Sequence, residues 1–278
     1  MLRSVDPDPT DRVLLSHTAS RDGLALIPER RGRTRSAALR KRRRSHVVGH
    51  RAQDGSALRP GQLNVDAIAP DWQVTAMQSG SRAAVVAVTR RMLDVAISLA
   101  ALVVLMPVLV LIAVLVRVDS PGPALYRQQR VGLAGRPFTL LKFRSMRLDA
   151  EAAGPCWAAE RDPRVTRLGR WLRRTRLDEL PQLLCVLNGA MSLVGPRPER
   201  PHFVDELTQA IPHFGLRTLV KPGITGWAQV NYPYGASVAD ARHKLAYDLF
   251  YIQHRSLLLD LSITFATLNV MLQGEGAR

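Results

Sequence analysis

Residues 95–116 read VAISLAALVVLMPVLVLIAVLV, and every residue in this stretch except Ser98 is apolar. A helix rises about 1.5 Å per residue, so a helix of this length can cross a hydrocarbon core of roughly 30 Å. A helix buried in the core of a soluble protein is the alternative interpretation. Because apolar runs of this length are typical of membrane segments, we expect the stretch to enter a bilayer.

Two features of this stretch favour a re-entrant helix over a simple span. Pro107 lies near its middle, where a proline removes a backbone hydrogen bond and kinks the helix. Both flanks are basic, with Arg90 and Arg91 before the stretch and Arg117 and Arg127 after it. The positive-inside tendency therefore gives neither end a preference for the far side. We expect residues 85–117 to form a re-entrant membrane helix with both ends in the cytoplasm, and a span is the alternative.

Residues 1–84 are polar and rich in arginine, with scattered proline and glycine and the basic run RKRRR at residues 40–44. No helical or alternating period is sustained there, so we predict a disordered basic tail. The basic run is either solvated or in contact with anionic lipid headgroups. A signal peptide is not expected, because no apolar stretch follows the first residues.

The charge of the chain indicates anionic partners. Its 278 residues include 39 Lys+Arg and 23 Asp+Glu, which gives a formal net charge of +16. Nucleic acid, lipid phosphate and nucleotides are the three candidate classes of partner. Aromatic residues make up only 5% of the chain, which leaves few platforms for base stacking, and no nucleic-acid-binding module is recognisable. We therefore expect lipid phosphate and nucleotides rather than nucleic acid.

The two cysteines carry little functional signal. Cys156 and Cys185 do not form a C-x-x-C pair, and no histidine cluster has the spacing of zinc ligands. We expect both to be small apolar residues of a reduced compartment.

Residues 118–278 are predicted to form a small cytoplasmic catalytic domain of the α/β class that is mainly helical. Two apolar segments flank a turn at residues 132–135, which predicts a hairpin. Asp162 and Pro163 suit the start of a helix in which Val165, Leu168 and Leu172 share a stripe. The rest of that helix is largely arginine with an adjacent tryptophan, a pattern typical of helices at a lipid interface.

Two further helices are predicted at residues 238–254 and 256–273. The second is apolar enough to be mistaken for another span. Asp260 and Asn269 would be costly in hydrocarbon, so we expect this helix to pack on the domain or to lie among lipid headgroups.

Adjacent carboxylates at Asp178 and Glu179 follow Arg173, Arg174 and Arg176 directly. Nearby guanidinium groups stabilise an ionised carboxylate and attract phosphates, which suits a nucleophile or a metal ligand. Mg²⁺ is commonly held by one or two carboxylates together with substrate phosphates, so this pair is a candidate Mg²⁺ site. Taken alone, an Asp-Glu pair beside arginines is usually a surface cluster of salt bridges.

The order of the motifs around this pair narrows the interpretation. Along the chain stand RRMLD at 90–94, DSPGP at 119–123, QRVG at 129–132, KFRSM at 142–146, RDPR at 161–164, LDELPQL at 177–183, MSLVGPRPE at 191–199 and KPGITGWAQV at 221–230. In this order they closely resemble the bacterial sugar transferase family, the monotopic phosphoglycosyl transferases that start exopolysaccharide and related glycan assembly. The resemblance covers residues 89–278.

The resemblance implies an activity and residue roles. The family transfers a hexose-1-phosphate from a UDP-sugar to polyprenyl phosphate, typically undecaprenyl phosphate, at the bacterial inner membrane, and it releases UMP. Its catalytic Asp-Glu dyad falls on Asp178 and Glu179, with the aspartate as nucleophile and the pair around Mg²⁺. Its phosphate-binding basic residues fall on Lys142 and Arg173. Arg144 and Arg197 are further candidates for substrate binding, since the prolines beside Arg197 give it a rigid backbone.

This sequence departs from the family in two places. Some relatives have Ser-Pro at the re-entrant break, where this chain has Met106-Pro107, so the break depends on Pro107 alone. Larger relatives also add transmembrane helices in front, where this chain has the basic stretch. Residues 77–94 resemble the N-terminus of a minimal member, and we hypothesise that translation starts at Met77.

Two other functions remain as alternatives. A basic membrane-tethered protein that binds nucleic acid or lipid without catalysis would show salt-dependent binding and no turnover of UDP-sugars. An ordinary glycosyltransferase would move the sugar without its phosphate and release UDP instead of UMP. The identity of the sugar does not follow from these motifs.

Overall fold

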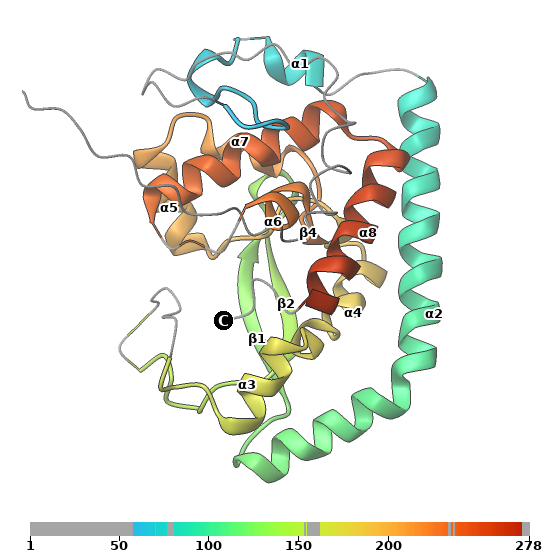
Figure 1. The fold of residues 1–278 in the computed structure, drawn as a ribbon, viewed down its shortest axis with the longest axis vertical. Coiled ribbons are helices and arrows are strands. Elements are labelled where there is room, and N and C mark those ends of the chain that lie inside the picture. The colour runs from blue at the N-terminus through green and yellow to red at the C-terminus, as the bar shows by residue number, and fades with distance from the viewer. Residues whose placement is uncertain are drawn as a thin grey trace, which may run out of the picture. The chain divides into compact units, whose positions relative to one another are not determined.

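The computed structural model describes residues 58–69, 71–76, 81–152, 154, 162–232, 235 and 237–273, and the statements below refer to these residues. They are mainly helical, with two small two-stranded sheets, as Figure 1 shows. The elements are η2 (Val65–Ala67), α1 (Trp72–Ala76), α2 (Ser81–Asp119), β1 (Leu125–Val131), η3 (Leu133–Gly135), β2 (Pro137–Phe143), α3 (Arg167–Arg174), η4 (Leu177–Glu179), α4 (Gln182–Leu187), β3 (Ser192–Val194), α5 (Pro201–Ala210), η5 (Phe214–Leu219), β4 (Gly223–Thr225), α6 (Trp227–Asn231), α7 (Val238–His254) and α8 (Leu257–Gln273).

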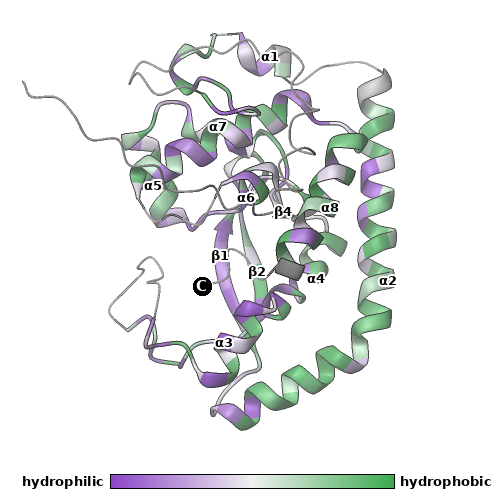
Figure 2. Cartoon of the chain, in the orientation of Figure 1, coloured by the Kyte–Doolittle hydropathy of each residue, from purple (hydrophilic) through white to green (hydrophobic). Residues whose placement is uncertain are grey.

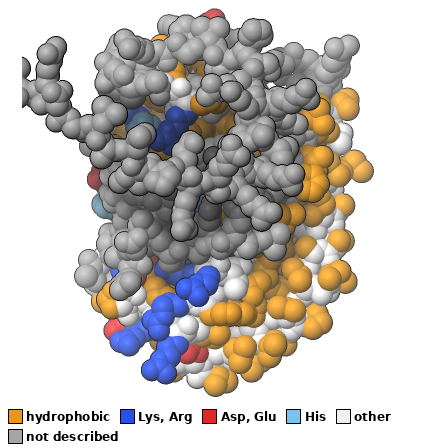
Figure 3. Space-filling view, viewed as in Figure 1, with side chains coloured by type: hydrophobic (Ala, Val, Ile, Leu, Met, Phe, Trp, Pro, Cys, Tyr) orange, Lys and Arg blue, Asp and Glu red, His pale blue; other side chains and the backbone are white. Residues whose placement is uncertain are grey.

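Helix α2 contains the apolar stretch and is long and apolar enough to cross a membrane, by length and composition. Pro107 lies inside the helix, and Figure 1 shows that α2 bends sharply before its C-terminal end. Valine and leucine side chains along it are exposed, among them Val104 at 75% and Leu111 at 57%. Figure 2 shows that most of α2 is made of hydrophobic residues, and Figure 3 shows hydrophobic side chains gathered along that edge of the molecule. Exposed aliphatic side chains at this density need an apolar environment.

The N-terminal half of α2 is anchored to the domain by three charged side chains. Arg90 Nε lies 2.6 Å from a carboxylate oxygen of Asp260 on α8. Arg91 donates to the last carbonyls of α4, at residues 186 and 187. Asp94 accepts hydrogen bonds from the Ser192 hydroxyl at 2.8 Å and from a main-chain N–H at the start of β3.

The C-terminal end of α2 contacts the same domain. Ile112 and Val116 are buried against Phe143 of β2 and Leu172 of α3. The Arg144 guanidinium donates to the main-chain oxygens of residues 116, 120 and 121, where the helix ends. One domain therefore holds both ends of the apolar helix, which is compatible with a kinked, re-entrant course.

The predicted hairpin is present. Strands β1 and β2 pair antiparallel from Leu125 opposite Phe143 to Val131 opposite Pro137, and the turn at residues 132–135 joins them. Strands β3 and β4 form a separate parallel pair. Both sheets are too small to bury two faces, so helices provide most of the core.

Helix α3 begins later than the sequence pattern suggested. Thr166, not Asp162, is its N-cap, and the threonine hydroxyl accepts a hydrogen bond from Gly169 N at 2.9 Å. Asp162 instead pairs with Arg164 in the preceding turn. The expected amphipathic pattern is present, because Leu172 is fully buried while Trp171 remains 50% exposed.

The prediction of disorder up to residue 84 is wrong for residues 58–69 and 71–76. Val65 and Trp72 belong to the largest buried apolar cluster, which also contains much of α7. Leu63 N donates to a main-chain oxygen of α7, and Asp66 pairs with Arg242 on the same helix. The ordered pieces are three to five residues long, too short to show a period. Residues 1–57 and 77–80, and Cys156, lie outside the described residues.

Helix α8 packs on the domain, as its polar residues predicted. It lies against α6 and the small parallel sheet, with Ile263 fully buried. Asp260 accepts a hydrogen bond from the Tyr251 hydroxyl at 2.8 Å in addition to its ion pair with Arg90. The other side of the helix is apolar and exposed, including Leu258 at 80% and Phe265 at 63%.

Candidate active site

The carboxylate pair lies in the short helix η4, between α3 and α4. Arg176 directly before it has φ 59°, the left-handed region that side chains other than glycine rarely adopt. Such strained residues gather at functional sites, where the surrounding structure holds them in place. The turn at Arg176 directs Asp178 inward, and that side chain is only 6% exposed.

Of the two acids, Asp178 is the one whose ionised form is less stabilised by its surroundings. Burial, and then the neighbouring charge of Glu179, raises its pKa to about 6, against the opposing effects of Lys142, Arg173 and Arg197. Among the described residues no hydrogen bond reaches its carboxylate. Its oxygens are therefore available to an incoming electrophile while the group is still mostly ionised at neutral pH.

Glu179 is in the opposite position. Burial alone would raise its pKa, but the Arg197 guanidinium binds both carboxylate oxygens and lowers the pKa to about 2. The Arg197 Nη2 to Glu179 Oε1 distance is 2.6 Å, and Nη1 to Oε2 is 3.3 Å. A two-point pair of this kind fixes the orientation of the carboxylate as well as its charge. The sequence led us to expect Arg197 to contact an anionic substrate; in the structure its guanidinium pairs with Glu179, and substrate binding by Arg197 stays a prediction.

Lys142, at the end of β2, is the second cation beside the pair. Burial first, and then repulsion by Arg130 and Arg173, lowers its pKa to about 8. The ammonium lies 5.3 Å from the centre of the Tyr126 ring. Lys142 is still mostly charged at neutral pH, and a phosphate at this position would stabilise the charged form further, since an anion within a few ångströms favours the ammonium.

Arg173 reaches the site from α3. Its Nε donates to the Ser145 hydroxyl at 2.9 Å, directly after β2. The two elements touch through backbone, because a Cβ on Gly169 would lie 2.0 Å from the Ser145 carbonyl oxygen. Sequence reasoning included Ser145 in a motif but assigned it no role. The available signal was that Ser145 stands in the same motif as Lys142, a candidate phosphate ligand.

Arg144 directs its hydrogen bonds to the end of α2 rather than to the carboxylate pair, and its expected role in substrate binding stays a prediction. Its side chain is buried, and its bonds go to the end of α2 and the following turn, including the Ser120 hydroxyl at 2.9 Å. Strand β2 ends at Phe143, so the alternation that would place residues 142 and 144 on one face is not maintained.

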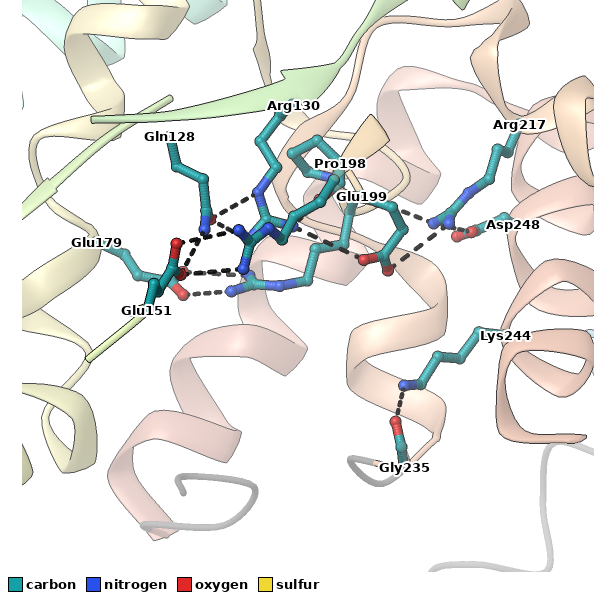
Figure 4. A network of polar contacts seen from close by, with 12 residues as sticks. Gln128, Arg130, Glu151, Glu179, Pro198, Glu199, Arg217, Gly235, Lys244 and Asp248 are labelled. Atoms are coloured by element: carbon teal, nitrogen blue, oxygen red, sulfur yellow. Dashed lines mark hydrogen bonds and ion pairs between the residues drawn. The ribbon is translucent and has the colours of Figure 1, made fainter. Parts of the chain in front are cut away.

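A second layer of charged residues lies behind Arg197 and was missed by sequence reasoning. Figure 4 shows it running from Glu179 past Pro198 and Glu199 to Arg217 and Asp248. Arg130 also belongs to it, and burial lowers the pKa of Arg130 to about 10. No local pattern distinguishes Asp248 from the other polar residues of α7, so its role was not visible in the sequence.

The carboxylate oxygens of Asp178 and Glu179 are the candidate protein ligands for Mg²⁺. Among the described residues no group of three or more His, Cys, Asp or Glu could hold a metal ion by itself. The Asp178 carboxylate oxygens accept no hydrogen bond from the described residues and are available as ligands, whereas both Glu179 oxygens already bind Arg197. The residues fit a Mg²⁺ that takes most of its oxygen ligands from a bound diphosphate and from water, which is how this ion is commonly held.

An apolar anchoring helix beside a buried carboxylate among cationic groups defines a membrane-associated protein suited to phosphate chemistry. Residues 85–274 match the family described as bacterial sugar transferase, and the chain belongs to that family.

Three relatives are informative. The chain is 44% identical over 189 residues to the UDP-N-acetylgalactosamine-undecaprenyl-phosphate N-acetylgalactosaminephosphotransferase of Aeromonas hydrophila. The matched region covers 68% of this chain and 45% of the relative. It is 41% identical over 214 residues to the UDP-glucose:undecaprenyl-phosphate glucose-1-phosphate transferase of Caulobacter vibrioides (76% and 80%). It is 41% identical over 199 residues to the exopolysaccharide production protein PSS of Rhizobium leguminosarum bv. phaseoli (68% and 98%). The chain therefore spans less than half of the first relative and most of the other two.

Proposed function

We propose that this protein transfers a sugar-1-phosphate from a UDP-sugar to undecaprenyl phosphate, as the first step of exopolysaccharide or related glycan synthesis. The observation that carries the proposal is the unbonded carboxylate of Asp178, enclosed by Lys142, Arg173 and the Arg197–Glu179 pair. The names of the relatives give the two substrates. They divide between N-acetylgalactosamine and glucose, so the sugar is left to experiment.

In the first step a carboxylate oxygen of Asp178 attacks the β-phosphorus of the UDP-sugar. The bond between that phosphorus and the oxygen bridging to the α-phosphorus breaks, and UMP leaves with the bridging oxygen. The sugar phosphate remains bound to Asp178 as an acyl phosphate, a mixed anhydride of the carboxyl group and the phosphate. Covalent catalysis of this kind divides one transfer into two easier displacements. Lys142 and Arg173 are placed to neutralise the phosphate oxygens during both steps.

In the second step a phosphate oxygen of undecaprenyl phosphate attacks the same phosphorus. The Asp178 carboxylate leaves, and the product is a polyprenyl-diphosphate sugar. Glu179, held by Arg197, stays ionised throughout. Its negative charge repels the phosphate bound to Asp178 and so disfavours a lasting bond between that phosphate and Asp178. The carboxylate pair, chiefly Asp178 because both Glu179 oxygens already bind Arg197, would help to hold Mg²⁺ together with the donor phosphates, and the ion would supply positive charge that neutralises the phosphate oxygens.

The acceptor is a lipid, so the site must work at a membrane. We infer a re-entrant course for α2 with the catalytic domain on the cytoplasmic face of the bacterial inner membrane. The anchoring of both ends of α2 by one domain supports this topology. The exposed Trp171 and the arginines of α3 would lie at the same lipid interface, a position that tryptophan and arginine favour.

The deciding experiment is a donor panel. Membrane-reconstituted protein is incubated with undecaprenyl phosphate, Mg²⁺ and UDP-glucose, UDP-galactose or their N-acetylated forms, and nucleotide products are separated. UMP from one donor is the expected result. UDP would indicate an ordinary glycosyltransferase. No nucleotide product from any donor, with salt-dependent binding of nucleic acid, would indicate the non-catalytic alternative.

A further inference from the structure

Residues 196–199 form a stretch in which each of the four main-chain carbonyls accepts a hydrogen bond. In chain order the donors are Gly223 N, Arg217 Nη2, Arg130 Nη1 and Val131 N, each at 2.9 Å. Pro196 and Pro198 also fix their own φ angles. The backbone that carries Arg197 is therefore held from both sides, and two of its four supports are arginine side chains.

Arg217 is the more enclosed of these two supports at its charged end. The nitrogen that donates to the Arg197 carbonyl also donates to Asp248 Oδ2 at 2.8 Å. The guanidinium lies 5.0 Å from the Phe214 ring centre, and the side chains of Arg217 and Asp248 are only 10% and 2% exposed. Nη2 thus serves Asp248 and the Arg197 carbonyl together, while Nη1 lies 3.7 Å from Glu199 Oε1, so both ends of the guanidinium fork have partners that fix its orientation.

Stability is a weak explanation for such a pair. Taking both charges out of water offsets most of their attraction, and buried ion pairs are often no more stabilising than apolar residues of the same size. The contacts indicate a different role, because the chain Asp248–Arg217–Arg197–Glu179 ends beside the proposed nucleophile.

We propose that Arg217, oriented by Asp248, is a positioning residue for the transfer: it holds the Arg197 backbone so that the Arg197 guanidinium stays on Glu179. The inference rests on the proposed function of Asp178 and Glu179. Without Arg217 the Arg197 side chain loses its fixed base, and the Glu179 charge next to Asp178 is no longer matched by a guanidinium in fixed geometry.

The first test is kinetic and uses Arg217→Lys. Lysine keeps a positive charge for Asp248 but lacks the planar fork that serves two acceptors. We expect UMP release to fall about 10- to 100-fold, the scale of a small misplacement in an active site. In an Arg197→Met background the same change should lower the rate by less than about twofold, because nothing remains to be positioned. An equal fold-loss in both backgrounds would show a general structural role and overturn the proposal.

The matched control is Arg242→Lys. Arg242 lies on α7, the same helix as Asp248, and forms an ion pair with Asp66, so the control makes the same replacement in a different ion pair. Its rate should stay near that of the wild type. If Arg217→Lys does not fold, the variant with Arg217→Met and Asp248→Asn together leaves no unpaired buried charge and enters the same comparison.

The second test does not depend on turnover. Experimental structures of the wild type and of Arg217→Lys are compared at the Arg197–Glu179 pair. Loss of the two-point contact in the variant is expected, and an intact contact would overturn the positioning role. Absence of UMP from the wild type with every donor would instead count against the proposed function, so the two failures are distinguishable.

Discussion

The Arg197 guanidinium and the Glu179 carboxylate form a two-point ion pair with a shortest distance of 2.6 Å. This pair separates the properties of two acids that are adjacent in sequence. Glu179 is held ionised with a pKa of about 2, while Asp178 has a pKa of about 6. Neighbouring carboxylates with such different pKa values usually have different tasks. Here the acid without a bonded partner is the one left free to react.

The pKa values predict a bell-shaped pH dependence. Asp178 must be ionised to attack, so UMP release should fall as the pH drops through about 6. Lys142 must be charged to hold phosphate, so the rate should fall again above about 8. The measurement is kcat/KM for the donor between pH 5 and 9, with membrane association followed in parallel. A flat profile over this range would remove one or both residues from the reaction.

Asp178→Asn should abolish adduct formation and lower UMP release by about three orders of magnitude or more, because the amide is not a nucleophile. Membrane association should be unchanged. The check is a mass measurement of protein incubated with the active donor and no lipid acceptor. The matched control is Asp205→Asn, an exposed residue of α5, which should still carry the adduct. A sugar-phosphate adduct on the Asp178→Asn protein would place the nucleophile elsewhere.

The sequence predicted those parts of the site that stand in local motifs. The apolar helix, the hairpin and the amphipathic α3 each have a period or turn that a short stretch displays. Lys142 and Arg173 were assigned through the family resemblance and Arg197 through its flanking prolines. The positive charges of all three lower the pKa of Asp178, and their roles toward substrate stay predictions.

The missed features all depend on contacts between distant segments. Arg217 and Asp248 are 31 positions apart, and neither has a distinguishing neighbour. Arg144 stands two residues after Lys142, yet the end of β2 turns it toward α2. Residues 58–69 and 71–76 pack against α7, about 170 positions later, so no local window of sequence could predict their order.

Gly169→Ala should displace α3 from Ser145. The added Cβ would lie 2.0 Å from a carbonyl oxygen, a contact that backbone atoms must move to relieve. Overpacking of this kind typically destabilises a protein by about 1–3 kcal/mol, and here it also moves Arg173. We expect a lower unfolding temperature and weaker donor binding. Gly215→Ala is the control, because nothing lies within 4 Å of its added Cβ. Equal effects of the two changes would contradict the close approach.

The topology of α2 can be tested with single cysteines at two exposed positions near its ends, Val85→Cys and Val118→Cys. The background carries Cys156→Ser and Cys185→Ala. If the helix is re-entrant, a membrane-impermeant maleimide should label both positions from the cytoplasmic side in inverted vesicles and neither in intact cells. Labelling of one position from each side would replace the re-entrant helix by a span.

Two tryptophans differ in their surroundings, so their replacement should have different effects on folding and on lipid binding. Trp72 is 8% exposed in the main core, whereas Trp171 is 50% exposed on α3. Trp72→Ala should lower the free energy of unfolding by about 3 kcal/mol, near the low end for a core tryptophan because its indole N–H is buried without a partner. Trp171→Ala should leave unfolding nearly unchanged and weaken binding to liposomes, since an indole at the interface contributes affinity for lipid. Denaturation in detergent measures the first effect and liposome flotation the second. The reverse result would mean that Trp72 is dispensable for the core and that α3 does not face lipid.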